Sequence, residues 1–133
     1  MNRGDDEAQR INQVTDVIIG SAIEVHRHLG PGLLESAYET CLFKELETRG
    51  LKYSRQVVLP VTYKGVEVEC GYRMDIVVEQ EVVIEVKSVV DWHPVYEAQL
   101  LSYLKLSGYK VGLAINFNVP LLKTGIKRMV NKL

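Results

Sequence analysis

Apolar positions in the N-terminal third of the chain recur at steps of three and four residues, the period of an α-helix. One such pattern covers residues 11–29, and a second covers residues 33–49. Gly30-Pro31-Gly32 separates them, because proline lacks an amide donor and glycine accepts left-handed dihedral angles. Gly50 is placed to end the second pattern. The first third is therefore predicted to form two helices.

The period then changes to two, which is typical of strands. Segments 56–63 and 66–70 are rich in β-branched residues or alternate strictly, and Lys64-Gly65 between them predicts a tight hairpin turn. Two further strands are predicted at 73–79 and 82–89, joined by a short polar turn.

A helical pattern at 95–106 precedes an apolar run at 111–117. A right-handed crossover through that helix would make strands 82–89 and 111–117 parallel. Residues 82–84 and 111–115 are apolar on both faces, as expected for central strands covered on two sides. Residues 120–133 fit either a final helix or an edge strand. The predicted fold class is α/β (α+β), a mixed sheet flanked by helices.

Length and composition favour one globular domain. The 133 residues are 47% hydrophobic and 25% charged, which argues against disorder and fibrous folds. We expect a flexible tail at 1–10 and a single domain at 11–133. No apolar run reaches the ~20 residues that span a bilayer, and Cys41 and Cys70 have no paired spacing. A cytoplasmic protein without a membrane segment is expected.

Charge is distributed unevenly along the chain. Residues 1–97 carry a net charge of −7, and residues 98–133 carry +6 with no acidic side chain. This asymmetry permits a face that binds a polyanion, although a solvated basic face is the common alternative. The basic residues of the C-terminal segment are Lys105, Lys110, Lys123, Lys127, Arg128 and Lys132.

Three charged residues stand inside predicted strands. Asp75 interrupts one apolar strand, and Glu85 and Lys87 share one face of the next. Burial of a carboxylate costs free energy unless the group is paired or bound to a metal. Two carboxylates close together repel each other, and a bound cation relieves this repulsion. Oxygen ligands of this kind favour Mg²⁺ or Mn²⁺. An internal salt bridge of Lys87 with either carboxylate explains the pattern equally well.

Other candidates lie on the predicted helices and on the loop between strand 82–89 and helix 95–106. Glu35 follows the Gly-Pro-Gly break, where it could simply complement the helix dipole, and Tyr38 could be a core aromatic residue. Gln99 and Tyr103 share one helical face near the Glu85–Lys87 strand. Trp92 could stack on a base, or it could make a hydrophobic contact.

These residues resemble the motifs of a known family. Residues 32–38, Gly-Leu-Leu-Glu-Ser-Ala-Tyr, are similar to the pattern of the GxxExxY proteins, a branch of the PD-(D/E)xK nuclease-like superfamily. Asp75, then 85–87, then 99–103 resemble that superfamily's successive motifs, with Met74 in place of the proline. The resemblance covers residues 17–131. It implies a restriction-endonuclease-like core, helix–strand–strand–strand–helix–strand, with an extra N-terminal helix.

The resemblance also implies roles for the residues. Asp75 and Glu85 would bind the metal, with the Val86 carbonyl and Glu35 as further ligands. Lys87 would position or activate the attacking water. Gln99 and Tyr103 would orient Lys87 or contact the substrate. Apart from the resemblance, Tyr38 and Trp92 are also predicted to contact the substrate.

Three hypotheses follow from the sequence. The first is a Mg²⁺- or Mn²⁺-dependent nuclease that hydrolyses phosphodiester bonds in DNA or RNA. The second is a catalytically silent module of the same fold that binds nucleic acid or a protein partner. The third is a homodimer that builds its substrate channel between two subunits.

Overall fold

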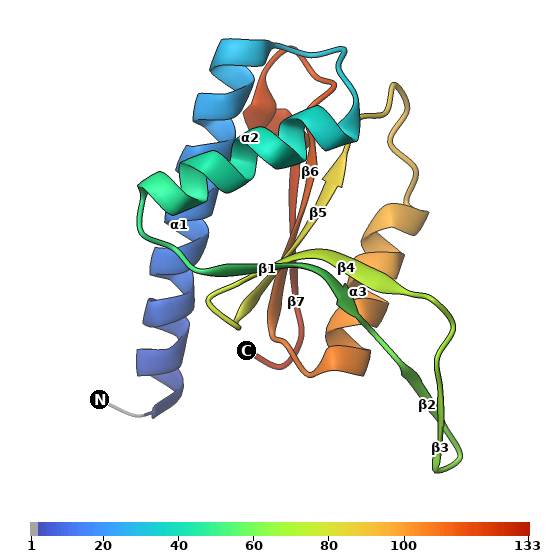
Figure 1. The fold of residues 1–133 in the computed structure, drawn as a ribbon. Helices are drawn as coiled ribbons and strands as arrows, with labels where there is room; N and C mark the ends of the chain where they lie inside the picture. The colour runs from blue at the N-terminus through green and yellow to red at the C-terminus, as the bar shows by residue number, and fades with distance from the viewer. Residues whose placement is uncertain (1–2) are drawn as a thin grey trace.

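The computed structural model describes residues 3–133, and Figure 1 shows its fold. The elements in chain order are α1 (Arg3–Leu29), α2 (Glu35–Thr48), β1 (Tyr53–Val58), β2 (Val61–Tyr63), β3 (Val66–Val68), β4 (Arg73–Val78), β5 (Val82–Lys87), α3 (Val95–Ser107), β6 (Val111–Asn116), the 3₁₀ helix η1 (Leu122–Gly125) and β7 (Ile126–Val130). The predicted order of helices and strands is confirmed except at 56–63, where the structure divides the one expected strand into β1 and β2.

Five strands form one mixed sheet in the order β1-β4-β5-β6-β7. β5 and β6 run parallel, as the crossover through α3 predicts, and the other neighbours are antiparallel. β2 and β3 form a separate hairpin that extends away from the sheet (Figure 1). The sequence of residues 120–133 fits either a final helix or an edge strand. In the structure this segment forms η1 and the edge strand β7. The restriction-endonuclease-like α/β fold is therefore confirmed.

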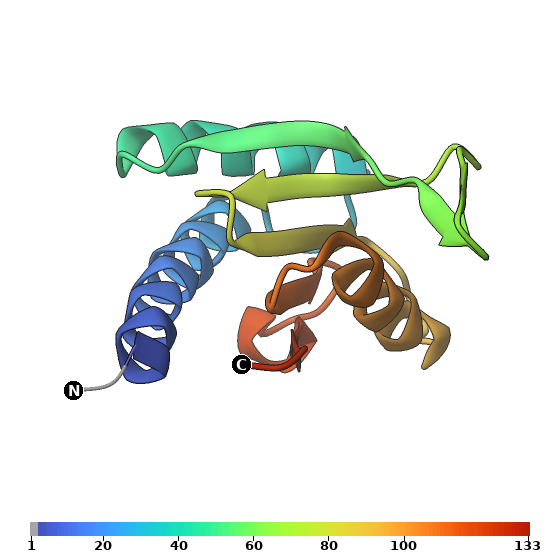
Figure 2. The ribbon, with the colours of Figure 1, turned by 90° about the horizontal axis from the view of Figure 1, so that it is seen from below.

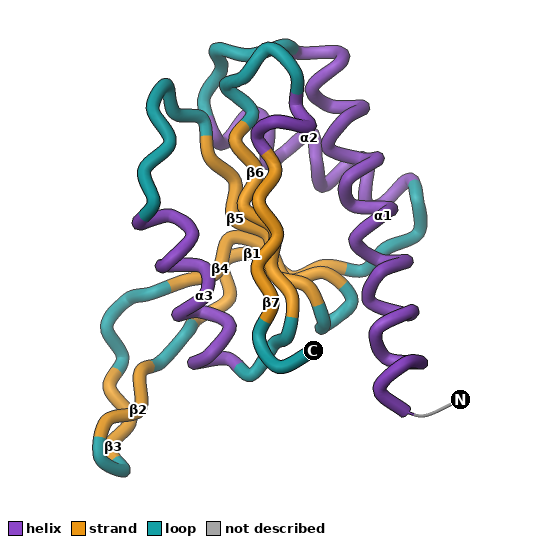
Figure 3. Tube along the Cα trace, turned by 180° about the vertical axis from the view of Figure 1, so that it is seen from behind, coloured by secondary structure: helices purple, strands orange, loops and turns teal. Residues whose placement is uncertain are grey.

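Helices cover both faces of this sheet. Figure 3 shows α1 and α3 on opposite sides of the strands, and Figure 2 shows the same layers from below. One hydrophobic cluster joins α1 and α2 to β4, β5 and β6 through residues such as Ile18, Leu42 and Ile84. A smaller cluster joins α3 to the other face through Leu100, Leu104 and Val83. β5 and β6 are buried on both faces, which explains their continuous apolar sequence.

Glycines end the helices where the sequence indicates. Gly30 and Gly32 have φ of 68° and 97°, values that other residues adopt at a cost. Gly50 follows α2 with φ 79°, and its amide donates to the Glu47 carbonyl at 3.1 Å. The connection between α1 and α2 is therefore a sharp, backbone-determined turn.

The N-terminal segment differs from the sequence prediction. Residues 3–10 are helical and continue α1, whereas we expected a flexible tail at 1–10. Ion pairs explain the added turns, because Glu7 pairs with Lys110 and Arg10 pairs with Glu81. Residues 1–2 lie outside the described part of the chain. Among residues 3–133, no helix is both long and apolar enough to cross a membrane.

Candidate active site

The candidate site lies where β4 and β5 separate. Their ladder ends at the pair Ile76 and Ile84. Beyond it, the Asp75 amide donates to Glu85 Oε2 at 2.8 Å, and the Val86 amide donates to Asp75 Oδ2 at 3.0 Å. Carboxylates thus replace the carbonyl oxygens that would continue the ladder. The structure brings Asp75 and Glu85 together, each fixed by the backbone of the opposite strand.

Burial changes the ionisation of both acids. Glu85 is only 6% exposed, and burial together with the nearby Asp75 charge raises its pKa to about 8. Burial also raises the pKa of Asp75, although the hydrogen bond from Val86 opposes this change. Two repelling carboxylates therefore share a partly dry site, an arrangement that a bound cation would relieve.

Lys87 ends β5 beside these acids. Its Nζ lies 4.9 Å from the centre of the Tyr96 ring, a cation–π contact that directs the side chain toward α3. Its positive charge lowers the pKa of both Asp75 and Glu85, against the larger effect of burial. Among residues 3–133, the ion pairs within 4.0 Å include none between Lys87 and these acids. The internal salt bridge considered from the sequence is therefore not formed.

Glu35 and Glu39 bring two more carboxylates from α2. Glu35 Oε2 accepts from the Ser88 amide at 3.3 Å, so Glu35 is connected to the loop after Lys87. Glu39 lies one turn later, and its pKa is raised by burial and then by the Asp75 charge. Sequence reasoning missed Glu39, although its spacing of four from Glu35 places both on one helical face.

Tyr38 lies in the hydrophobic core. It is fully buried and stacks on Phe117 with ring centroids 4.5 Å apart. Its hydroxyl donates to the Gly30 carbonyl at 2.6 Å and accepts from the Leu33 amide at 3.1 Å. Tyr38, which the sequence predicts to contact substrate, thus has its ring packed on Phe117 and its hydroxyl bonded to the Gly-Pro-Gly turn.

Gln99 and Tyr103 line a groove of about 460 Å³ between α3 and the segment 61–72, which contains the β2–β3 hairpin. Tyr72 stands on the other wall, with its ring centroid 6.2 Å from that of Tyr103. Burial and then the charges of Glu85 and Asp75 raise the pKa of Tyr103. The charges of the two acids therefore act on one wall of the groove.

Trp92 and Asn116 shape the loop after β5. Trp92 is half-buried, donates from Nε1 to Glu97 at 3.1 Å and packs its ring edge against Tyr96. Asn116 is buried, and its amide group bonds both the N–H and the carbonyl of Val89 at 3.0 Å. Sequence reasoning missed Asn116, whose only signal is a polar side chain at the end of an apolar strand.

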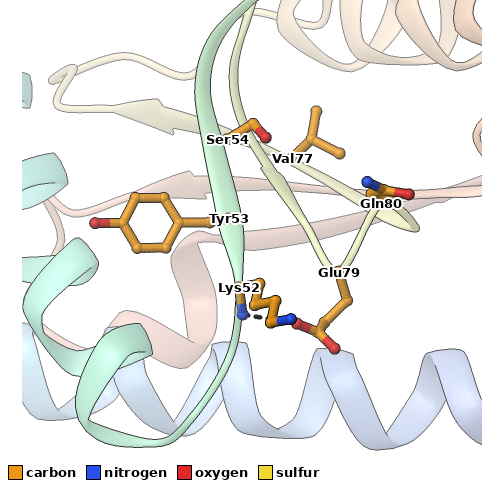
Figure 4. Close-up of a pocket in the computed structure, with 6 residues that line it drawn as sticks. All are labelled: Lys52, Tyr53, Ser54, Val77, Glu79 and Gln80. Atoms are coloured by element: carbon orange, nitrogen blue, oxygen red, sulfur yellow. Dashed lines mark hydrogen bonds between the residues drawn. The ribbon is translucent and has the colours of Figure 1, made fainter.

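A separate surface pocket of about 290 Å³ lies at the other end of β4, near its turn into β5 (Figure 4). Its polar groups satisfy one another, because the Lys52 amide donates to Glu79 Oε2 at 2.6 Å and the Glu79 amide donates to the Lys52 carbonyl at 2.8 Å. It contains none of the predicted site residues.

Metal-binding capacity follows from the donors present. Among the described residues, no three His, Cys, Asp or Glu side chains are grouped closely enough to form a metal site by themselves. Asp75 and Glu85 are nevertheless hard oxygen donors held together, and Mg²⁺ sites often use one or two carboxylates with waters and substrate phosphate. The donor set fits such a cation.

Comparison with known proteins agrees with this geometry. A family model of the PD-(D/E)XK nuclease superfamily matches residues 12–129. No curated protein and no solved structure matches the chain significantly. The matched range contains all the residues of the candidate site. The acids between β4 and β5, the lysine that follows them and the fold around them thus have one common explanation, and the chain belongs to the PD-(D/E)XK nuclease superfamily.

Proposed function

We propose that the protein is a Mg²⁺- or Mn²⁺-dependent nuclease that hydrolyses phosphodiester bonds in DNA or RNA. The observation that supports this most strongly is the pair Asp75 and Glu85, buried at the separation of β4 and β5 with Lys87 beside them. A structural ion pair would bring Lys87 within 4.0 Å of Asp75 or Glu85. The ion pairs among the described residues include no such contact.

Each residue has a role in this proposal. Asp75, Glu85 and the Val86 carbonyl would hold the cation, which supplies Lewis-acid activation of water and of the phosphate. Lys87 orients the attacking water and stabilises the charge that grows on the phosphate oxygens. Water adds to phosphorus as the bond to the leaving sugar oxygen breaks. Glu39 and Glu35 face this centre from α2.

We assign the chain to the GxxExxY branch on the physical roles of its motif. Gly32 adopts φ 97°, Glu35 accepts from Ser88, and the Tyr38 hydroxyl closes the turn between them and α1. The motif thus joins the α1–α2 turn to the loop that follows Lys87. Ser88 adds a second connection, because its hydroxyl donates to the Leu33 carbonyl at 2.6 Å.

The decisive experiment incubates plasmid DNA, single-stranded DNA and RNA with the protein in Mn²⁺. Asp75→Asn keeps the side-chain shape and one acceptor oxygen, so we expect a folded protein with cleavage reduced by about 100-fold or more. Asp16→Asn, an exposed acid on α1, is the matched control and should cleave normally. Cleavage that Asp75→Asn leaves unchanged would refute the assignment.

The alternative is a silent module that binds nucleic acid or a protein partner. The absence of a three-carboxylate metal group among the described residues favours it. Calorimetric titration with Mn²⁺ separates the two functions, because a silent module would bind no metal at millimolar concentration. Sedimentation at two protein concentrations tests whether a homodimer forms the substrate channel.

A further inference from the structure

Gln56 has a backbone conformation that is out of place in a strand. Its φ is 49°, in the left-handed region that side chains other than glycine rarely adopt. The other described non-glycine residues with positive φ are in turns or near the chain end: Lys64, Glu79, Gln80 and Lys132. Inside β1 no turn requires this geometry, so the surroundings must hold Gln56 there.

The strain coincides with a gap in the sheet. In the β1–β4 ladder, Arg55 pairs with Ile76 and Val57 pairs with Met74, while Gln56 and Asp75 between them form no pair. The Asp75 amide instead donates to the Glu85 carboxylate. The distortion of β1 therefore lies directly opposite the first acid of the candidate site.

The side chain of Gln56 connects two carboxylates from different elements. Hydrogen bonding from Gln56 lowers the pKa of Asp75 on β4 and that of Glu39 on α2, which places its amide beside both carboxyl groups. A primary amide has two N–H donors, so one glutamine can serve two acceptors. Asp75 and Glu39 repel each other, and the neutral amide holds them at a fixed separation.

We propose that Gln56 is a positioning residue for the metal centre, which fixes Asp75 and connects it to Glu39 on α2. This inference rests on the proposed nuclease function. Glutamine suits the role because a lysine or arginine would compete with the cation for Asp75, whereas a further carboxylate would add repulsion. Glutamine supplies donors without charge. Partners of this kind orient metal ligands and tune their affinity.

The test compares Gln56→Gly with Gln80→Gly. Both changes place glycine where φ is positive, at 49° and 55°, so both relieve the same backbone strain. Only the first removes the amide from the site. Mn²⁺ affinity is measured by calorimetry, and folding by thermal melting. We expect Gln56→Gly to weaken Mn²⁺ binding by about tenfold, as loss of a partner of a metal ligand does, with an unchanged or higher Tm. Gln80→Gly should bind Mn²⁺ like the wild type.

The other outcomes overturn the proposal in distinguishable ways. Equal Mn²⁺ affinity in Gln56→Gly and the wild type would refute the positioning role and leave the nuclease assignment intact. A large fall in Tm for Gln56→Gly would show that the residue supports the strand rather than the metal centre. Failure of the wild type to bind Mn²⁺ would overturn both the metal centre and the role of Gln56.

Discussion

At the residue scale, the site depends on how burial changes the pKa values of Asp75 and Glu85. Glu85 has a pKa of about 8 because burial and Asp75 both disfavour its charge. The pKa of Asp75 is raised in the same direction, with burial as the larger cause. The metal-free protein therefore carries a proton on Glu85 at neutral pH that its unfolded chain would have released.

This proton uptake makes stability depend on pH with a definite sign. Between pH ~4.5 and 8 the folded chain binds more protons than the unfolded chain, so the free energy of unfolding falls as pH rises through this window. Glu85→Gln removes the titrating group and keeps an acceptor for the Asp75 amide. We expect its Tm, measured in EDTA, to exceed that of the wild type at pH 8.5 and to approach it at pH 5. A wild-type Tm that increased from pH 5 to pH 8.5 relative to Glu85→Gln would contradict this prediction.

At the element scale, the turn between α1 and α2 positions Glu35 and Glu39. The turn has two left-handed glycines, and α2 begins at Glu35 without a side-chain cap. The buried hydroxyl of Tyr38 takes over the function of a cap, since it binds one carbonyl and one amide of the turn. The geometry of the motif therefore depends on one oxygen atom.

Removal of that oxygen is the prediction at this scale. Tyr38→Phe keeps the stack on Phe117 but leaves the Gly30 carbonyl and the Leu33 amide without their partner, so we expect a loss of about 1–3 kcal/mol in the free energy of unfolding. Tyr53→Phe is the matched control, because Tyr53 also stacks on a phenylalanine while its hydroxyl bonds Glu47 near the surface. Urea unfolding should show a clearly smaller change for Tyr53→Phe. Equal changes would contradict the capping role.

At the scale of the whole molecule, the sheet brings a basic edge toward the acids. Glu85 pairs with Ala114 of β6, which pairs with Lys127 of β7. Two strand spacings of ~5 Å put Lys127 in the same cross-strand row, about 10 Å from Glu85 in the backbone. Lys127 also lines a small pocket with Trp92. Lys127 of the basic C-terminal segment thus lies beside the candidate site, although the two are separate in sequence.

Phosphate contact by Lys127 is testable through salt dependence. We expect Lys127→Ala, measured in Ca²⁺ to prevent cleavage, to weaken nucleic-acid binding and to reduce the slope of log K against log salt by about 0.9. Lys52→Ala is the control, since Lys52 lies by the pocket near the β4–β5 turn (Figure 4). Fluorescence anisotropy at four salt concentrations gives both slopes. A slope unchanged in Lys127→Ala would exclude this path for the substrate.

The sequence by itself determined the elements and their order. Helical and strand periods, glycine stops and the apolar runs of β5 and β6 are local properties, set by dihedral preferences and by which side chains avoid water. For the same reason Asp75, Glu85 and Lys87 stand out as charges within apolar strands. The length of α1 was underestimated because ion pairs with Lys110 and Glu81, more than 70 residues away, stabilise its first turns.

Only the tertiary structure decided which of these charges meet, and how. That Gln56 faces Asp75, that Glu39 joins Glu35 beside the site and that Lys127 shares a row with Glu85 all follow from strand register and helix packing. The burial of Tyr38 is likewise a result of packing against Phe117. Register and packing are set by contacts between segments distant in the chain, and no local period encodes them.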